Sequence, residues 1–246
     1  MKEPRANSVE TFCGWIVGLI VLLNGCATST PSQNFDIPRE EFFAQVRVIA
    51  QAPMILPSGM SPEKTQVIHA KFQQLLAEAA QQRGFTVIPA LQTYQISDRL
   101  LRELGGALDP RKDLQKLRVY RDYLRREIRE RFRADAVLAA EIIPVTAKYS
   151  GTTARWHGAS QSIAATGLSV TELLFGEHAG TVPAFSLLVW VEDAVSGARL
   201  WSGLGGVHVL SKREAGKWAP VPVEDALSDQ ARCRDAVKFA FKSLRD

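Results

Sequence analysis

The sequence has few of the residues from which most catalytic centres are built. Its 246 residues include three cysteines and four histidines, and no two histidines stand at metal-ligand spacing. The zinc signatures HExxH and CxxC, the nucleophile signature GxSxG and the glycine signatures of phosphate loops are all absent from the sequence. The sequence therefore favours neither a metal site nor a cofactor, and we expect a protein that is not an enzyme.

A long hydrophobic run is also missing. The main apolar run near the N-terminus, residues 11–23, has 13 residues, whereas a membrane-spanning helix needs about 20. Its length fits the hydrophobic segment of a signal peptide, and Lys2 and Arg5 before it fit the basic start of one. The run therefore predicts a secretion signal, with an uncleaved anchor or a cytoplasmic start as the alternatives.

The end of this run, Leu23-Asn24-Gly25-Cys26, resembles the lipobox of bacterial lipoproteins, with an aliphatic residue, a small residue and then cysteine. The resemblance implies that residues 1–25 are a removed signal peptide and that Cys26 carries a diacylglycerol. Two or more acyl chains hold a protein stably on a membrane. Ala27 after the cysteine resembles the sorting pattern for the periplasmic face of the outer membrane, with the inner membrane as the alternative.

The cysteine count agrees with this interpretation. Cys13 would be lost with the signal and Cys26 would be lipidated, which leaves Cys233 alone. The mature chain therefore contains no internal disulfide, although its compartment is oxidising. Cys233 lies in a helical pattern, so we expect a small buried hydrophobe, and a reactive thiol is the alternative.

The mature chain is expected to form one α/β domain joined to its lipidated N-terminus by a short flexible tether. Residues 26–40 are polar and contain proline, which predicts a flexible tether, and its fourteen residues after Cys26 span at most about 45–50 Å. Residues 41–246 predict a single mixed-sheet sandwich with helices packed on the sheet. A hydrophobic fraction of 46% is sufficient for a core.

Local patterns predict the elements of this domain. Alternation at 42–50 predicts a strand, and Ser61-Pro62-Glu63 predicts the start of a helix that Gly84 ends. Residues 85–88 predict a second strand. Together the three elements predict a parallel βαβ unit. Helices are expected at 97–104, 109–132 and 223–244, and a buried strand at 136–145. Strands at 183–193 and 198–208 form a late antiparallel hairpin. The glycines at 203–206 lie in that strand pattern, which indicates a bulge or a close backbone approach and not a phosphate loop.

Several segments carry a family resemblance. They are FFAQVRVIA, RGFTVIPA and ADAVLAAEI, followed by FSLLVWVEDAVSGARLWSG. They resemble the small α/β domain of curli-secretion lipoproteins, penicillin-binding-protein activator lipoproteins and the N-terminus of the Tol–Pal translocation protein. The matching positions are Ala134, Asp135, Asp193, Ser196, Gly197 and Ser202. The resemblance covers about 120 residues and implies a fold; it implies an activity only weakly.

The segment 146–180 departs from this pattern. It is rich in Gly, Ser, Thr and Ala and contains Tyr149, Trp156 and Phe175. One interpretation is a β-hairpin, 145–149 with 154–163, followed by a loop. The other is an inserted surface for a partner or an oligomer, with Trp156 and Phe175 as anchors.

The predicted helix at 109–133 is strongly basic. It holds ten Lys/Arg and five Asp/Glu, a net charge of +5, against +4 for the whole chain. Its arginines recur at a spacing of three to four residues and include Arg118, Arg121, Arg125 and Arg129. They predict either a solvated face with local ion pairs or a contact with an acidic partner or anionic lipid. Nucleic acid is excluded by the compartment.

Three classes of function remain open from the sequence. The leading hypothesis is a membrane-anchored envelope lipoprotein that binds a protein partner and so assists assembly or regulation of an envelope complex. The second is a self-assembling secretion-channel subunit in which 146–180 rearranges. The third is an envelope hydrolase whose site the sequence does not reveal.

Overall fold

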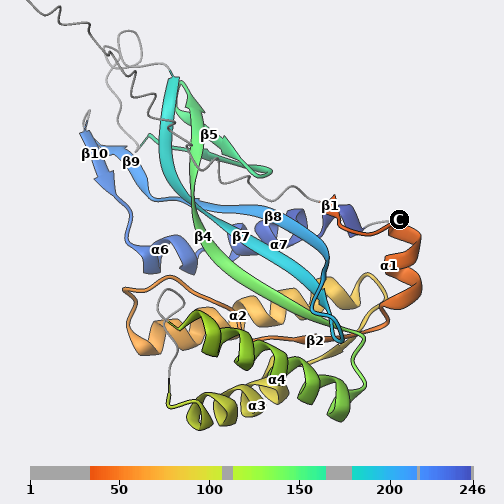
Figure 1. Cartoon of the computed structure of the whole chain (residues 1–246). Coiled ribbons are helices and arrows are strands. Elements are labelled where there is room, and N and C mark those ends of the chain that lie inside the picture. The colour runs from red at the N-terminus through yellow and green to blue at the C-terminus, as the bar shows by residue number, and fades with distance from the viewer. Residues whose placement is uncertain (1–33, 107–112, 165–178, 215–216, 245–246) are drawn as a thin grey trace, which may run out of the picture. The chain divides into compact units, whose positions relative to one another are not determined.

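The structure is a computed structural model that describes residues 34–106, 113–164, 179–214 and 217–244. These residues form a mixed α/β fold, as the sequence predicts (Figure 1). The strands are β1 (Asn34–Phe35), β2 (Val48–Gln51), β3 (Thr86–Ile88), β4 (Ala136–Ser150), β5 (Thr153–Trp156), β6 (Ala159–Ser162), β7 (Ala179–Asp193), β8 (Arg199–Val209), β9 (Ser211–Glu214) and β10 (Lys217–Pro220). The helices are α1 (Arg39–Gln45), α2 (Pro62–Gln81), α3 (Ala90–Glu103), α4 (Leu114–Phe132), α6 (Val223–Ser228), α7 (Gln230–Ala240) and the 3₁₀ turn η1 (Lys242–Leu244).

Eight of the described strands form one sheet. Its order is β1-β8-β7-β4-β2-β3, and β5 and β6 continue it beside the far end of β4. β2 pairs in parallel with β3 and β4, whereas β4, β7 and β8 pair antiparallel. The predicted βαβ start and late hairpin are both confirmed. β9 and β10 form a separate two-stranded sheet.

The predicted signals for α2 lie where they were expected. The Ser61 hydroxyl accepts a hydrogen bond from the backbone N–H of Lys64 at 3.4 Å, and Pro62 occupies the first helical position. Gly84 follows the helix with φ +83°, a left-handed conformation that glycine adopts without steric cost. Short-range signals therefore mark both ends of this helix, and its buried face packs into the core.

The start of the domain differs from the prediction. Residues 42–45 belong to helix α1, the strand begins only at Val48, and packed structure begins at Asn34, inside the predicted tether. The cause is an aromatic cluster at the end of the sheet. The ring of Phe42 lies 5.2 Å from the rings of Phe35 and Phe43 and 6.0 Å from that of Phe85. A helix can present both Phe42 and Phe43 to this cluster, which a strand cannot.

The later helices also differ in their limits. α3 begins at Ala90, seven residues before the predicted start, because Pro89 precedes the helix and the buried Gln51 side chain accepts from the Ala90 N–H at 3.3 Å. The predicted 223–244 helix is broken at Asp229, whose carboxylate accepts from the Arg232 N–H at 3.1 Å and caps α7. α4 begins at Leu114; the predicted residues 109–112 lie outside the described residues.

The two faces of the sheet have separate cores. On one face, α1, α2, α6 and α7 pack against alternate residues of β4 and β7, including Leu138, Ile142, Leu187 and Val189. On the other face, α3 and α4 pack Ile96, Leu100, Leu124 and Ile128 against β2 and Val137 of β4. The parallel strands are thus covered on both faces, which agrees with their continuous apolar sequence.

Helix α7 lies on β8 with its backbone in close contact. A Cβ atom built on Gly203 would lie 2.0 Å from the Ala240 carbonyl oxygen, and one on Gly205 would lie 1.9 Å from that of Ala236. The predicted close backbone approach at these glycines is therefore confirmed. We call this contact between α7 and β8 the glycine seam.

Cys233 belongs to the same packing layer. Its side chain is fully buried and its thiol donates to the Leu227 carbonyl at 3.4 Å. Burial raises the pKa of the thiol to about 11, so it is protonated at neutral pH. The prediction of a small buried hydrophobe is confirmed.

Two residues of the family resemblance have structural roles. The Asp135 carboxylate accepts from the N–H groups of Arg47 and Val48 at 2.9 and 2.8 Å, which fixes the start of β2 beside β4. The Asp193 carboxylate accepts from the N–H groups of Val195 and Ser196 at 3.0 and 2.6 Å, which closes the β7–β8 turn. Burial alone would raise the pKa of Asp193, but these hydrogen bonds outweigh burial and lower it.

Candidate functional site

A groove of about 870 Å³ lies between α2 and the first turns of α3. It lies where β2 and β3 end, because Gln51 is the last residue of β2 and Pro89 follows β3. The carboxyl ends of parallel strands are the usual place for binding sites in α/β folds. We call this cavity the α2–α3 groove.

The wall that α2 contributes follows one helical stripe. The lining positions recur from Pro62 to Ala77, and at 1.5 Å per residue they extend along about 22 Å of helix. Ala70 and Ala77 keep this wall shallow, because an alanine leaves room above the helix backbone. The groove is therefore elongated.

The lining of the groove carries no Asp, Glu, Lys or Arg. None of its fourteen residues has a charged side chain, although 23% of the whole sequence is charged. Its polar groups are three glutamines on α2, Gln51, one threonine, and the pair His69 and Tyr94. Such a surface binds an uncharged ligand most favourably, since a charged group placed there would lose water without gaining a counter-charge.

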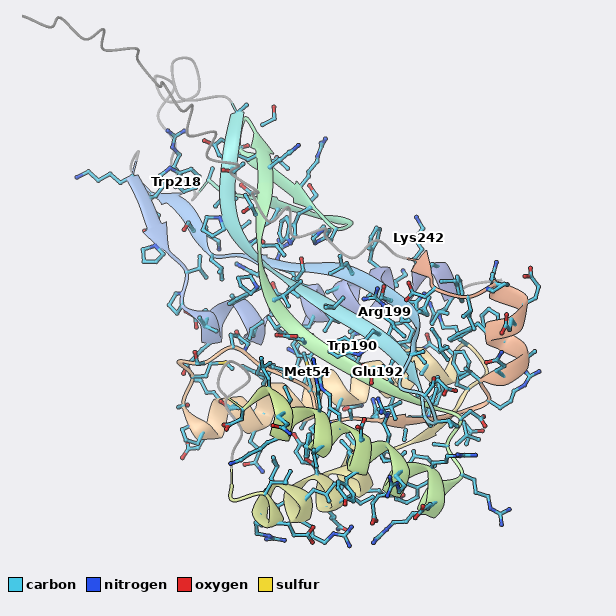
Figure 2. The ribbon with its side chains drawn as sticks, viewed as in Figure 1. Met54, Trp190, Glu192, Arg199, Trp218 and Lys242 are labelled. Carbon is cyan, nitrogen blue, oxygen red and sulfur yellow. The ribbon has the colours of Figure 1, made fainter. Side chains whose placement is uncertain are left out.

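His69 and Tyr94 face each other across the groove. Their ring centroids lie 5.1 Å apart, and the Tyr94 hydroxyl contacts the imidazole. The His69 ring also lies 3.2 Å from the carbonyl oxygen of Met54, which is labelled in Figure 2. Burial lowers the pKa of His69 and raises that of Tyr94 to about 12, so both are neutral near pH 7.

The floor of the groove is fixed by Gln51. Its side chain is 3% exposed; the amide donates to the Gln73 carbonyl at 2.9 Å and the carbonyl accepts from Ala90. The Thr93 hydroxyl contacts the Gln51 backbone carbonyl. One buried side chain thus connects α2, β2 and α3, which holds the two walls at a constant separation.

Two apolar side chains at the rim of the α2–α3 groove are exposed to solvent. Leu91, which lines the groove, is 72% exposed, and Val67, one turn before Ala70 on α2, is 68% exposed. Single exposed apolar residues are common, but these two flank an uncharged groove and extend its apolar surface outward.

The structure does not assemble the predicted partner-binding residues into one surface. Trp156 is 7% exposed, and its indole N–H donates to the Phe185 carbonyl at 3.0 Å. The prediction of Trp156 as an exposed anchor is therefore wrong, because the alternation of Ala154 and Trp156 in β5 turns both toward a small core.

Phe175 lies outside the described residues, as does Cys26. The predicted hairpin of 145–149 with 154–163 is present as β4–β5, and β6 adds a further strand.

The arginines of α4 have different surroundings. Arg125 contacts Asp122, and its guanidinium occupies the space beside Gly197 of the β7–β8 turn, so its side chain is only 16% exposed. Arg125 is therefore a structural residue and not a free contact. Arg118, Arg121 and Arg129 are exposed, and their role in binding stays a prediction. The ion pair of Arg131 with Glu127, at 2.8 Å, is one of the local pairs expected for this helix.

The α2–α3 groove could not be located from sequence motifs. Its residues come from separate segments, and the stripe on α2 has the composition of a solvated helix face. Among the described residues no group of three or more His, Cys, Asp or Glu could hold a metal ion. No helix in that part of the chain is both long and apolar enough to cross a membrane.

Comparison with known proteins finds similarity only at the level of structure. No family and no curated protein matches the chain. Lipoprotein GNA1162 from Neisseria meningitidis is 16% identical, over 69% of this chain and 88% of that chain, with a TM-score of 0.33. The LpoB C-terminal domain from Salmonella enterica is 14% identical, over 69% and 91%, with a TM-score of 0.30. A PelC dodecamer from Paraburkholderia phytofirmans is 11% identical, over 84% and 93%, with a TM-score of 0.29. One of these structures, GNA1162, is of a lipoprotein.

Proposed function

We propose that this protein is a non-enzymatic lipoprotein of the bacterial envelope that binds a protein partner in the α2–α3 groove. The observation that supports it most is the groove itself, which is elongated, uncharged and flanked by exposed apolar side chains. The lipobox-like Leu23-Asn24-Gly25-Cys26 supports the anchoring at the membrane, with the outer membrane as the expected site.

The shape of the groove indicates the kind of partner segment. A wall that extends along about 22 Å of α2 matches an amphipathic helix of about 15 residues. Recognition of a helix in a groove uses apolar anchors at i, i+3, i+4 and i+7, which meet an uncharged lining without loss of ion hydration. The occupant we propose is therefore the apolar face of a helix in a protein of the envelope.

The test compares two exposed leucines. A photocrosslinking amino acid replaces Leu91 in the groove or Leu114 on α4, which is 60% exposed and outside the groove. We expect one dominant crosslinked species in the envelope from position 91 and none from position 114. The species should disappear when Ala70→Asp is added, since a carboxylate in the uncharged groove opposes the apolar contact. Equal crosslinking from both positions, or no effect of Ala70→Asp, would refute the groove as the docking site.

The anchor is tested separately. We expect a radioactive or clickable fatty-acid precursor to label the wild-type chain and not Cys26→Ala, because only a thiol can take the diacylglycerol. The matched control Cys233→Ala removes a buried cysteine and should keep the label. Unchanged labelling of Cys26→Ala would contradict the anchor and would leave the groove to be judged on its own test.

A further inference from the structure

A second cavity lies on another part of the molecule, and the α2–α3 groove does not include any of its residues. It has a volume of about 370 Å³ and is enclosed by the β5–β6 turn, by β8 and by α7. This volume is within the usual range of about 300–1,000 Å³ for small-molecule sites. The cavity differs from the groove in its charge.

The turn that forms one wall has a fixed conformation. His157 and Gly158 join β5 to β6 with φ +36° and +77°, the pair of positive values that a two-residue type I′ hairpin requires. The Gly206 N–H of β8 donates to the His157 carbonyl at 2.9 Å. A Cβ atom on Gly158 would lie 2.2 Å from the Phe239 ring of α7. The turn is therefore held by both β8 and α7, and the wall is formed before any ligand binds.

Helix α7 and its end supply most of the charge. Arg232, Asp235, Lys238 and Lys242 all line the cavity and recur at three to four residues, so they share one face. Three basic groups and one carboxylate give a local net charge of +2. Figure 2 shows Lys242 at the end of this helix. Such a set of charges attracts an anion. The attraction weakens as the salt concentration rises, because the two lysines are exposed.

The partners of these cations leave positive charge available. Arg232 already contacts the Asp229 carboxylate at 3.4 Å, and Lys242 lies over the Phe239 ring at 5.5 Å. Within the described residues no carboxylate lies within ion-pair distance of Lys238 or Lys242. An anion in the cavity would meet two ammonium groups and the nearby hydroxyl of Ser160, which also lines it.

His157 provides a sensitive reporter at this site. Its Nδ1 lies 2.7 Å from the hydroxyl oxygen of the fully buried Ser186. Burial lowers the pKa of His157, and the other charged groups that line the cavity are those of α7 named above. A bound anion would favour the protonated imidazole and would therefore raise this pKa.

We propose that the cavity between the β5–β6 turn, β8 and α7 binds a small anion that carries a phosphate or carboxylate group, with Lys238 and Lys242 as its main ligands. The shared chemistry is a compact oxyanion, either free in solution or at the end of a lipid headgroup. The site is independent of the α2–α3 groove, so its failure would leave the proposed docking function untouched.

The experiment uses the full chain with Cys26→Ala, so that no attached lipid contributes to binding. The imidazole signals of His157 are followed by NMR during titration with inorganic phosphate and, separately, with citrate. We expect saturable shifts and a rise in the pKa of His157. Lys238→Ala combined with Lys242→Ala should weaken binding at least tenfold, whereas Lys116→Ala on α4 should leave it unchanged. Thermal unfolding of each variant shows that the fold is intact.

A vesicle experiment distinguishes the two sources of the anion. Vesicles of phosphatidylcholine with and without phosphatidylglycerol are sedimented with the same variants. Binding to the anionic vesicles that needs Lys238 and Lys242 supports a headgroup, and shifts with soluble phosphate or citrate support a free anion. The proposal is overturned when neither probe gives saturable binding, or when Lys116→Ala weakens binding as much as the double variant does.

Discussion

The glycine seam and the α2–α3 groove are two contacts of helices with the same sheet, and they are built in opposite ways. In the seam, Gly203 and Gly205 let the backbone of α7 approach β8 until no methyl group fits between them. In the groove, α2 and α3 lie on different faces of the sheet, and the fixed side chain of Gln51 holds them apart. Close packing therefore leaves no free space at the seam, whereas the open space of the groove is where we propose that the partner binds.

The largest effect is expected from removing a side chain at the seam. Phe241 is 1% exposed and its ring lies 5.5 Å from that of Trp201. Phe241→Ala should lower the free energy of unfolding by about 3–5 kcal/mol, because a large cavity would form in a layer that cannot collapse. Chemical denaturation measures this, with Leu114→Ala as the exposed control. A loss below 1 kcal/mol would show that the seam is less rigid than its geometry indicates.

A smaller loss is expected from adding one methyl group to the seam. Gly205→Ala places a Cβ against the Ala236 carbonyl, so α7 must move or tilt. Overfilled cores lose about 1–3 kcal/mol, and a contact with backbone should reach the upper end, about 3 kcal/mol. The unfolding midpoint in urea measures the change. An unchanged midpoint would contradict the close approach of α7 and β8.

Acid should lower the stability of the fold through three partly or fully buried histidines. Burial lowers the pKa of His69 in the groove, and also those of His157 and His208. Between the unfolded value near 6.5 and the lower folded values, the unfolded chain binds more protons, so stability falls as pH decreases through this window. Glu141, whose pKa burial raises, acts in the opposite sense between its folded pKa and the unfolded value near 4.5.

Thermal unfolding from pH 7.5 to 5.5 measures this dependence. His69→Gln should reduce the slope by removing one of the three contributions, whereas a wild-type midpoint that rises in acid would contradict the assignment. The lowered pKa of Asp193 belongs to a separate window below about pH 4, where we expect protonation to weaken the hydrogen bonds that its carboxylate accepts in the β7–β8 turn.

The smallest effect is expected in the groove. Ala70→Leu adds three carbon atoms to an exposed position on its α2 wall. We expect a change within about 0.5 kcal/mol, since nothing in the fold needs the space that the side chain fills. The same variant should weaken the crosslink from position 91, because it occupies the volume left for the partner. A large destabilisation would remove the distinction between the two regions.

The fold was predictable where its causes are local. The Ser61 cap and the Gly197 turn act within a few residues, so their patterns indicate their structures. The start of the first strand was not predictable, because Phe42 and Phe43 join a helix only through contacts with Phe35 and Phe85. Long-range packing overrides local alternation there.

The candidate sites were less predictable than the fold. Trp156 in a segment rich in small residues has the appearance of a surface anchor, and only the pairing of β4, β5 and β6 turns it inward. The groove has no motif because its distinguishing feature is an absence of charged side chains, and such an absence on one helical stripe resembles an ordinary solvated face. His157 and Lys238 are 81 residues apart and meet only through the packing of the β5–β6 turn on α7.

The short pairing of β1 with β8 gives the chain a mechanical property. Only Asn34 and Phe35 pair there, opposite Ser202 and Trp201, and the ion pair of Asp36 with Arg199 at 2.7 Å follows directly. For a chain held at Cys26, tension on the anchor would reach these few bonds before it reached the long β4–β7 ladder. Opening residues 34–38 would lengthen the tether between Cys26 and the folded core by about 16 Å while the core stayed folded. If Cys26 carries the anchor, the domain would then reach two different distances from the membrane, depending on the tension applied.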